Sequence, residues 1–258
     1  MFATQLTFAK EQIMSNVRST GFWLVVAGGL AGLGYLVLGT SFGWPAVLDE
    51  PGTVALPLFA QAETAIRLGF LAQMGSSLAL LVAAVHAQAA WGRVTPGDLT
   101  ITVFGVLGAT IQTFGWARWP VVVPGLSELH ATATTGADRA VVAADYDLLN
   151  AYAGGTLGEF LGWVFQAVWA VGFATWLWRR SALPRWLTGL GLVLAWGWAV
   201  TLPTGIALGL GAVEFVGVNV YTVWFLWILA VGVTLAVGRH TASAGDPAVA
   251  PIPETAAP

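Results

Sequence analysis

The sequence predicts an all-α protein: a polytopic transmembrane helix bundle of six spans with both termini in the cytoplasm. Three observations lead to this fold class. Only 9% of the 258 residues are charged, against about 25% in an ordinary soluble domain. The mean hydropathy is +0.77, and the charged residues gather in short segments between long apolar runs. Each run has roughly the 20 residues that cross a hydrocarbon core of ~30 Å.

The first 20 residues are predicted to form an amphipathic helix at the membrane interface. Their apolar side chains recur at helical spacing, at Phe2, Leu6, Ala9, Ile13 and Val17. A disordered leader is the alternative interpretation. Ser19 and Thr20 could cap the helix that follows.

Six apolar runs are predicted to span the membrane, at about residues 21–40, 63–91, 99–119, 156–178, 186–210 and 215–237. They make one transmembrane domain over residues 21–238. The Ala- and Pro-rich tail, residues 239–258, is predicted to be disordered. The longest loop is expected at residues 120–155, with a short helix over 137–152 that lies on the bundle.

The orientation follows from the basic residues. Both termini inside would give the cytoplasmic side seven Lys and Arg residues and the outer side three, which are Arg67, Arg118 and Arg139. That bias follows the positive-inside rule. The composition, rich in Ala, Gly and Val with a single lysine, suggests a bacterial genome. The predicted location is therefore the bacterial plasma membrane.

Six polar residues begin or end predicted spans on the outer side, and they are the candidate binding residues: Glu63, Arg67, Arg118, Glu159, Asn219 and Tyr221. Glu63 and Arg67 are four residues apart and can pair on one helix face. Two interpretations of the set stay open. Glu159 could form a structural ion pair with Arg118 or Arg67, or the same groups could surround a water-filled pocket.

Three glycines, Gly154, Gly158 and Gly162, lie on one stripe of the fourth predicted span. Small residues at this spacing allow a neighbouring helix to approach closely. The stripe lies beside Glu159, and this favours a position for Glu159 against other helices.

No catalytic residues, metal ligands or cofactor are predicted. Cysteine is absent, which excludes thiol catalysis and thiolate metal sites. His86, His130 and His240 lie too far apart in the predicted topology to form one zinc site. No phosphate-binding loop, dinucleotide fingerprint or nucleophile elbow occurs. The net charge of −3 also argues against a nucleic acid partner.

Three segments carry a resemblance to a known family: ARWPVVVPGL at 117–126, YAGGTLGEFLGWVFQAVWAV at 152–171 and RRSALPRWLTGLG at 179–191. They resemble a bacterial multi-pass membrane family known only as a domain of unknown function. The resemblance covers about residues 20–240 and implies six or seven spans and a plasma-membrane location. It implies no activity, substrate or cofactor. Arg118 and Glu159 match the polar positions of that family.

The sequence therefore favours an accessory, binding or sensing component of the membrane, without an assigned enzymatic activity. Its expected partners are the lipid bilayer and a small ligand or another membrane protein. One alternative is a small-solute or proton-coupled transporter that uses the outer polar cluster and a kink at Pro203. Another is a membrane enzyme acting on a lipid or quinone near Glu159 and Arg118.

Overall fold

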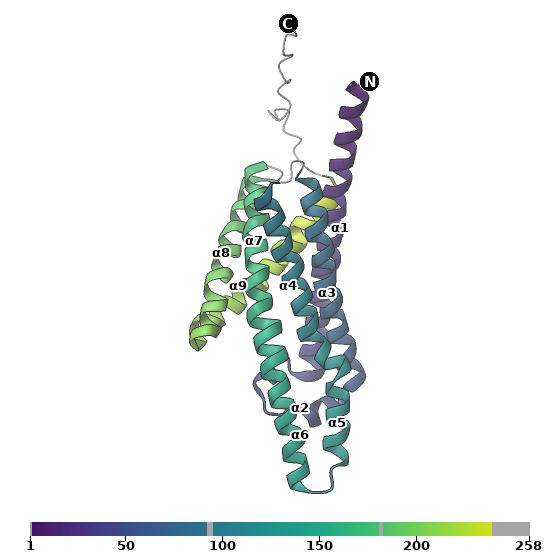
Figure 1. Ribbon diagram of the computed structural model, residues 1–258, viewed down its shortest axis with the longest axis vertical. Helices are drawn as coiled ribbons and strands as arrows, with labels where there is room; N and C mark the ends of the chain where they lie inside the picture. Colours follow the sequence, from purple (N-terminus) through teal and green to yellow (C-terminus); the bar gives the residue numbers. More distant parts are fainter. Residues whose placement is uncertain (1, 92–94, 181–182, 239–258) are drawn as a thin grey trace.

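The computed structural model describes residues 2–91, 95–180 and 183–238, and it contains helices but no strand in those ranges (Figure 1). Six of these helices are long and apolar enough to cross a membrane. The predicted fold class, an all-α polytopic bundle, is confirmed. The elements in chain order are α1 (Phe2–Phe42), η1 (Ala46–Asp49), α2 (Gly52–Gln61), α3 (Glu63–Ala90), α4 (Pro96–Val121), α5 (Val123–Thr132), α6 (Gly136–Leu149), η2 (Asn150–Leu161), α7 (Gly162–Arg180), α8 (Arg185–Leu208) and α9 (Gly211–Ala236). The predicted disordered tail lies outside the described residues.

Helix α1 is a single unbroken helix of 41 residues, which includes the stretch predicted to lie at the interface. No proline occurs before Pro45, so nothing removes a helical hydrogen bond in this stretch. Thr20, expected in a cap, instead lies inside the helix, where its hydroxyl donates to the carbonyl of Asn16 at 2.9 Å. The N-terminal turns project beyond the bundle (Figure 1).

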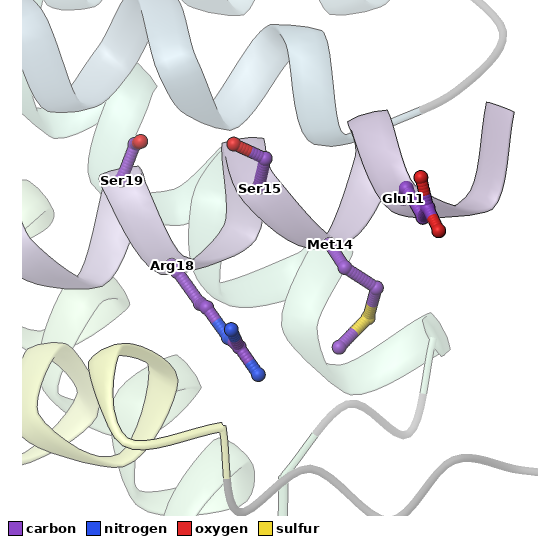
Figure 2. Close-up of a pocket in the computed structure, with 5 residues that line it drawn as sticks. All are labelled: Glu11, Met14, Ser15, Arg18 and Ser19. Atoms are coloured by element: carbon purple, nitrogen blue, oxygen red, sulfur yellow. The ribbon is translucent and has the colours of Figure 1, made fainter. Parts of the chain in front are cut away.

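The base of this projection packs beside the end of α9. Figure 2 shows Met14 and Arg18 on one side of α1, with Ser15 and Ser19 on the other. The Arg18 guanidinium lies close to Gly238, 3.3 Å from the position that a Cβ would take there. A cation is favoured at this place, because the C-terminal end of α9 carries a partial negative charge.

The segment 120–155, predicted as the longest loop, is mostly helical. Helix α4 continues to Val121, and α5 begins one residue later with a proline in its first turn. The expected short helix is present as α6, capped by the Thr135 hydroxyl, which accepts from the Asp138 amide at 3.1 Å. Instead of lying on the bundle as a separate short helix, α6 continues through η2 into α7 as one continuous helical segment of 45 residues (Figure 1).

Element η2 is a π-helical stretch of twelve residues in the middle of that segment. Its wider turn places residues five apart in register, and the Thr156 hydroxyl donates to the carbonyl of Ala151 at 3.2 Å. Such stretches are rare and frequently mark functional sites. The glycine stripe predicted for close packing begins here.

The backbone at Gly154, Gly158 and Gly162 packs directly against α4, and we call this contact the glycine seam. A Cβ on Gly115 would lie 2.5 Å from the Cα of Gly158, and one on Gly162 would lie 2.6 Å from the Gln112 Cγ. A Cβ on Gly154 would lie 2.5 Å from Arg118 Nη2. The close approach predicted from the stripe is therefore confirmed.

Two apolar clusters make up the interior. The larger lies among α1, α3, α7, α8 and α9 and includes Trp169, Trp198 and Trp224. The smaller joins the end of α1 to α2, α3, α4 and α6 around Trp119 and Tyr146. Helices α8 and α9 form a hairpin whose turn uses Gly209 at φ +63°. That turn lies away from α6, at the left of Figure 1.

Candidate functional site

The six candidate residues lie in four separate places. Glu63 and Arg67 are at the start of α3, where Arg67 Nη1 lies 3.1 Å from Glu63 Oε1. The predicted pairing is confirmed. Both side chains are nearly half exposed, at 46% for Arg67 and 44% for Glu63. They line a shallow surface hollow with Ser127 and Glu128 of α5.

Arg118 occupies a different environment, in the last turn of α4. It is 4% exposed. Its Nη1 donates to the carbonyl of Gly115, and its Nη2 donates to Asn150 Oδ1 at 3.0 Å. Asn150 Nδ2 in turn donates to the carbonyl of Leu48 at 2.9 Å. Arg118 of α4 therefore connects directly to Asn150 at the start of η2 and, through Asn150, to η1.

Hydrogen-bond donors outnumber acceptors around Arg118. Its Nε is buried without a partner among the described residues, as are Trp119 Nε1 and the Tyr146 hydroxyl. The Trp119 and Tyr146 rings lie 6.0 Å apart, and the guanidinium lies 5.2 Å from the Trp119 ring centroid. Buried donors normally find an acceptor. This region is therefore suited to a group that accepts hydrogen bonds.

Glu159 lies half-buried on η2. Its carboxylate interacts electrostatically with Arg118, with Glu214 at the start of α9 and with Asp49 of η1. A direct ion pair from Glu159 to Arg118 or Arg67, one of the two interpretations above, is not formed. Within the described ranges the ion pair closer than 4.0 Å is that of Arg67 with Glu63.

Arg118 and Glu159 lie at one depth in the bundle. Glu159 precedes Arg179 by 20 residues, and Arg118 follows Asp98 by the same number. Both intervals are almost entirely helical. At 1.5 Å per residue each interval is ~30 Å long, which equals the thickness of a hydrocarbon core. Arg118 and Glu159 therefore lie about one core thickness from Asp98 and Arg179, at the other end of the two helical intervals.

Tyr221 belongs to a deeper polar group. Its hydroxyl donates to Gln166 Oε1 at 3.1 Å, and Gln112 Nε2 donates to the same oxygen at 2.6 Å. Both glutamines are buried. Gln112 lies six residues from Arg118, which places the group ~9 Å further into the bundle. Asn219 joins neither group, because it is exposed and donates within its own helix to the carbonyl of Phe215.

Two residues that the sequence did not single out, Asn150 and Gln166, organise these groups. Gln166 could have been noticed as a polar side chain inside a span, because such residues are rare and face the bundle interior. Asn150 gave no comparable signal, since it lies outside the predicted spans. No three His, Asp or Glu side chains gather as metal ligands within the described part of the chain.

A family model described as "Domain of unknown function (DUF4386)" matches residues 19–232, most of the chain. The chain therefore belongs to this family, and the predicted resemblance to a family of unknown function is confirmed. Neither the curated proteins nor the solved structures give a match. The bundle and its six apolar helices indicate a multi-pass membrane protein.

Proposed function

We propose that this member of the DUF4386 family is a binding or sensing component of the bacterial plasma membrane, and that it holds an anionic group of its ligand at Arg118. The observation that carries the proposal is the buried guanidinium. It has no carboxylate within 4.0 Å among the described residues, and its Nε has no acceptor. The excess of basic residues on one side supports the proposed orientation, with both termini inside.

The energetic argument concerns the charge of Arg118. An arginine inside a membrane segment costs about 2.5–3.5 kcal/mol at mid-membrane and less near the headgroups. In this place the cost is offset by two hydrogen bonds to neutral acceptors. A carboxylate or phosphate would add charge-assisted hydrogen bonds, which are about twice as strong as neutral ones.

A small-solute transporter is the second candidate, and one observation favours it. The polar group of Gln112, Gln166 and Tyr221 lies deeper along the same seam as Arg118. Polar side chains at two depths would suit a route for a polar solute through the bundle better than a single binding site. Uptake of a retained ligand into proteoliposomes would support the transporter, whereas binding without uptake would support the binding component.

The test of the proposal is native mass spectrometry of the protein released from nanodiscs, with an absorption spectrum alongside. The wild-type protein should retain a stoichiometric molecule that bears an acidic group. Arg118→Gln should lose this molecule, because the substitution removes the charge and the Nε donor. Arg67→Gln is the matched control, since it makes the same change at an exposed arginine. Equal retention by both variants would rule out Arg118 as the site.

A further inference from the structure

The N-terminal part of α1 carries a charge that no described residue neutralises. The Arg18 side chain is exposed, and it makes no ion pair within 4.0 Å among the described residues. It lines a surface hollow that runs along α1 from Glu11 to Ser19, and it points towards the end of α9 (Figure 2). The hollow therefore offers a guanidinium to a negatively charged group from outside the chain.

The position of Arg18 along α1 corresponds to the phosphates of a bilayer. No charged residue occurs between Arg18 and Asp49, so the apolar run that crosses the hydrocarbon core begins directly after Arg18. Helix α9 ends at the same level, because the Arg18 guanidinium lies beside Gly238. An arginine at the end of a span extends its guanidinium to the interface. Arg118, in the last turn of α4, lies at the other end of the bundle, near α5 (Figure 1).

The same face of α1 continues into the membrane as an open apolar surface. Phe22, Gly29 and Leu36 follow Arg18 at helical spacing, and all three are exposed. A Cβ on Gly29 or Gly32 would meet nothing within 4 Å, so the helix surface is recessed there between the larger side chains. The interval from Arg18 to Gly29 is about 16 Å along the helix, close to one leaflet of a ~30 Å core.

We propose that α1 binds one anionic phospholipid of the leaflet at its N-terminal end. The phosphate lies in the hollow at Arg18, and an acyl chain lies along the recessed surface at Gly29 and Gly32. One molecule fits both features because they share a helix face and are separated by the depth of a leaflet. The hollow alone would fit any soluble anion, and the apolar surface alone would fit any lipid. This site is separate from the one proposed at Arg118.

The charges on α1 favour a lipid over a second copy of this chain. In a two-fold dimer with its axis along the membrane normal, two α1 helices packed through this face would place Arg18 against Arg18. Such like-charge contacts are unfavourable. Glu11, which also lines the hollow, is about 10 Å further from the hydrocarbon core than Arg18. The headgroup layer is about 5–8 Å thick, so Glu11 lies beyond the phosphate.

The first experiment measures which lipid the full chain retains. Native mass spectrometry would follow the protein released from nanodiscs of phosphatidylglycerol, phosphatidylethanolamine and phosphatidylcholine in equal parts. The wild type should prefer phosphatidylglycerol about five-fold over either of the others, the factor by which one arginine near a membrane surface attracts anionic lipid. Arg18→Gln should abolish this preference. Arg185→Gln is the matched control and should keep it, because Arg185 is an exposed arginine whose guanidinium lies 5.0 Å from the Trp178 ring centroid.

The second experiment tests the position of the acyl chain. Gly29→Leu combined with Gly32→Leu would fill the recessed surface, where a Cβ meets no atom of a described residue within 4 Å. The double variant should keep the wild-type melting temperature in detergent and lose most of the retained phosphatidylglycerol. Gly211→Leu is the control, since a Cβ at this first residue of α9 also meets nothing within 4 Å, and it should keep the lipid.

Three results would overturn the proposal. The first is equal retention of the three lipids by the wild type, a comparison that needs no variant. The second is an equal loss of preference in Arg18→Gln and Arg185→Gln, which would mean that arginines at this end of the bundle attract anions without a specific site. The third is a lipid-free dimer that the glycine variants dissociate, which would assign the face to a second copy. Retention that depends on Arg18 but not on Arg118 would support the lipid site even if the proposed function fails.

Discussion

The sequence predicts Arg67 and Arg118 in one polar cluster, and the folded chain gives them opposite surroundings. Arg67 lies on the surface of α3, nearly half exposed, with its partner Glu63 one turn away on the same helix. Arg118 is buried and contacts Gly115, Asn150 and the backbone at Gly154. Arg67 pairs with a residue four positions away on its own helix, whereas Arg118 bonds to a segment that is distant in the sequence.

The glycine seam produces this difference. Because Gly154 and Gly158 have no side chain, η2 can lie directly on α4, with the backbone at Gly154 next to the Arg118 guanidinium. At the start of α3, the Arg67 side chain is not enclosed by a neighbouring helix, since it stays 46% exposed. The comparison shows that packing against a neighbouring segment leaves Arg118 buried, whereas Arg67 stays exposed.

The largest effect is expected from a substitution that forces η2 and α4 apart at the glycine seam. Gly158→Leu should destabilise the protein by about 3 kcal/mol, the upper end of the usual cost of overpacking, because the side chain would meet the α4 backbone at Gly115. Reversible unfolding in mixed micelles measures the change. Gly32→Leu on α1 is the control, since a Cβ there meets nothing within 4 Å, and it should change stability little. Equal losses in the two variants would contradict the seam.

A smaller effect is expected from removing the partner of Arg118. Asn150→Leu should cost about 2 kcal/mol, because it leaves a donor of a buried cation without its acceptor. The same substitution in an Arg118→Met background should cost less than half as much. A double-mutant cycle followed by thermal unfolding in detergent checks this coupling. Additive losses would mean that the bond to Asn150 contributes nothing.

The deeper polar group should be less sensitive than Arg118. Tyr221→Phe removes one donor from Gln166 Oε1, which keeps the bond from Gln112. The expected loss is about 0.6 kcal/mol, the average for hydrogen bonds between membrane helices. Tyr35→Phe is a matched control on an exposed tyrosine. A loss above about 2 kcal/mol would place this group, rather than Arg118, at the energetic centre of the bundle.

The smallest effect is expected at the surface ion pair. Glu63→Gln should change the free energy of unfolding by no more than about 0.5 kcal/mol, because both partners are exposed and adjacent on one helix. The difference from wild type should shrink further in high salt. A salt-independent loss comparable to that of Asn150→Leu would remove the contrast between the two arginines.

The fold class was predictable because long apolar runs report directly on spans. The sequence was less informative where the chain leaves the membrane. Helix α5 follows Pro120 and Val121 with one residue between helices, and a proline in a first turn is compatible with a helix as well as with a loop. The sequence predicts helix α6, but the continuation of α6 into α7 depends on the π-helical η2, which no pattern in the sequence indicates.

The contacts of the candidate residues were predictable only where the two partners are close in the sequence. The pair of Glu63 and Arg67 follows from a spacing of four residues. By contrast, Asn150 is 32 residues from Arg118 and 102 residues from Leu48, the two groups that it joins. Counting along a span gives the depth of a residue, but a span that is apolar on all sides does not show which face it turns to its neighbours. Asn219 and Tyr221 illustrate this limit, since one is exposed and the other points to Gln166.

The unbroken rod from Gly136 to Arg180 has a mechanical consequence. Its 45 residues reach about 65 Å, roughly twice a hydrocarbon core. The excess length is at the α6 end, which carries Asp138, Arg139 and Asp145. A displacement of its tip beside Thr135 would be transmitted along the helix to η2, where Gly154 faces the Arg118 guanidinium.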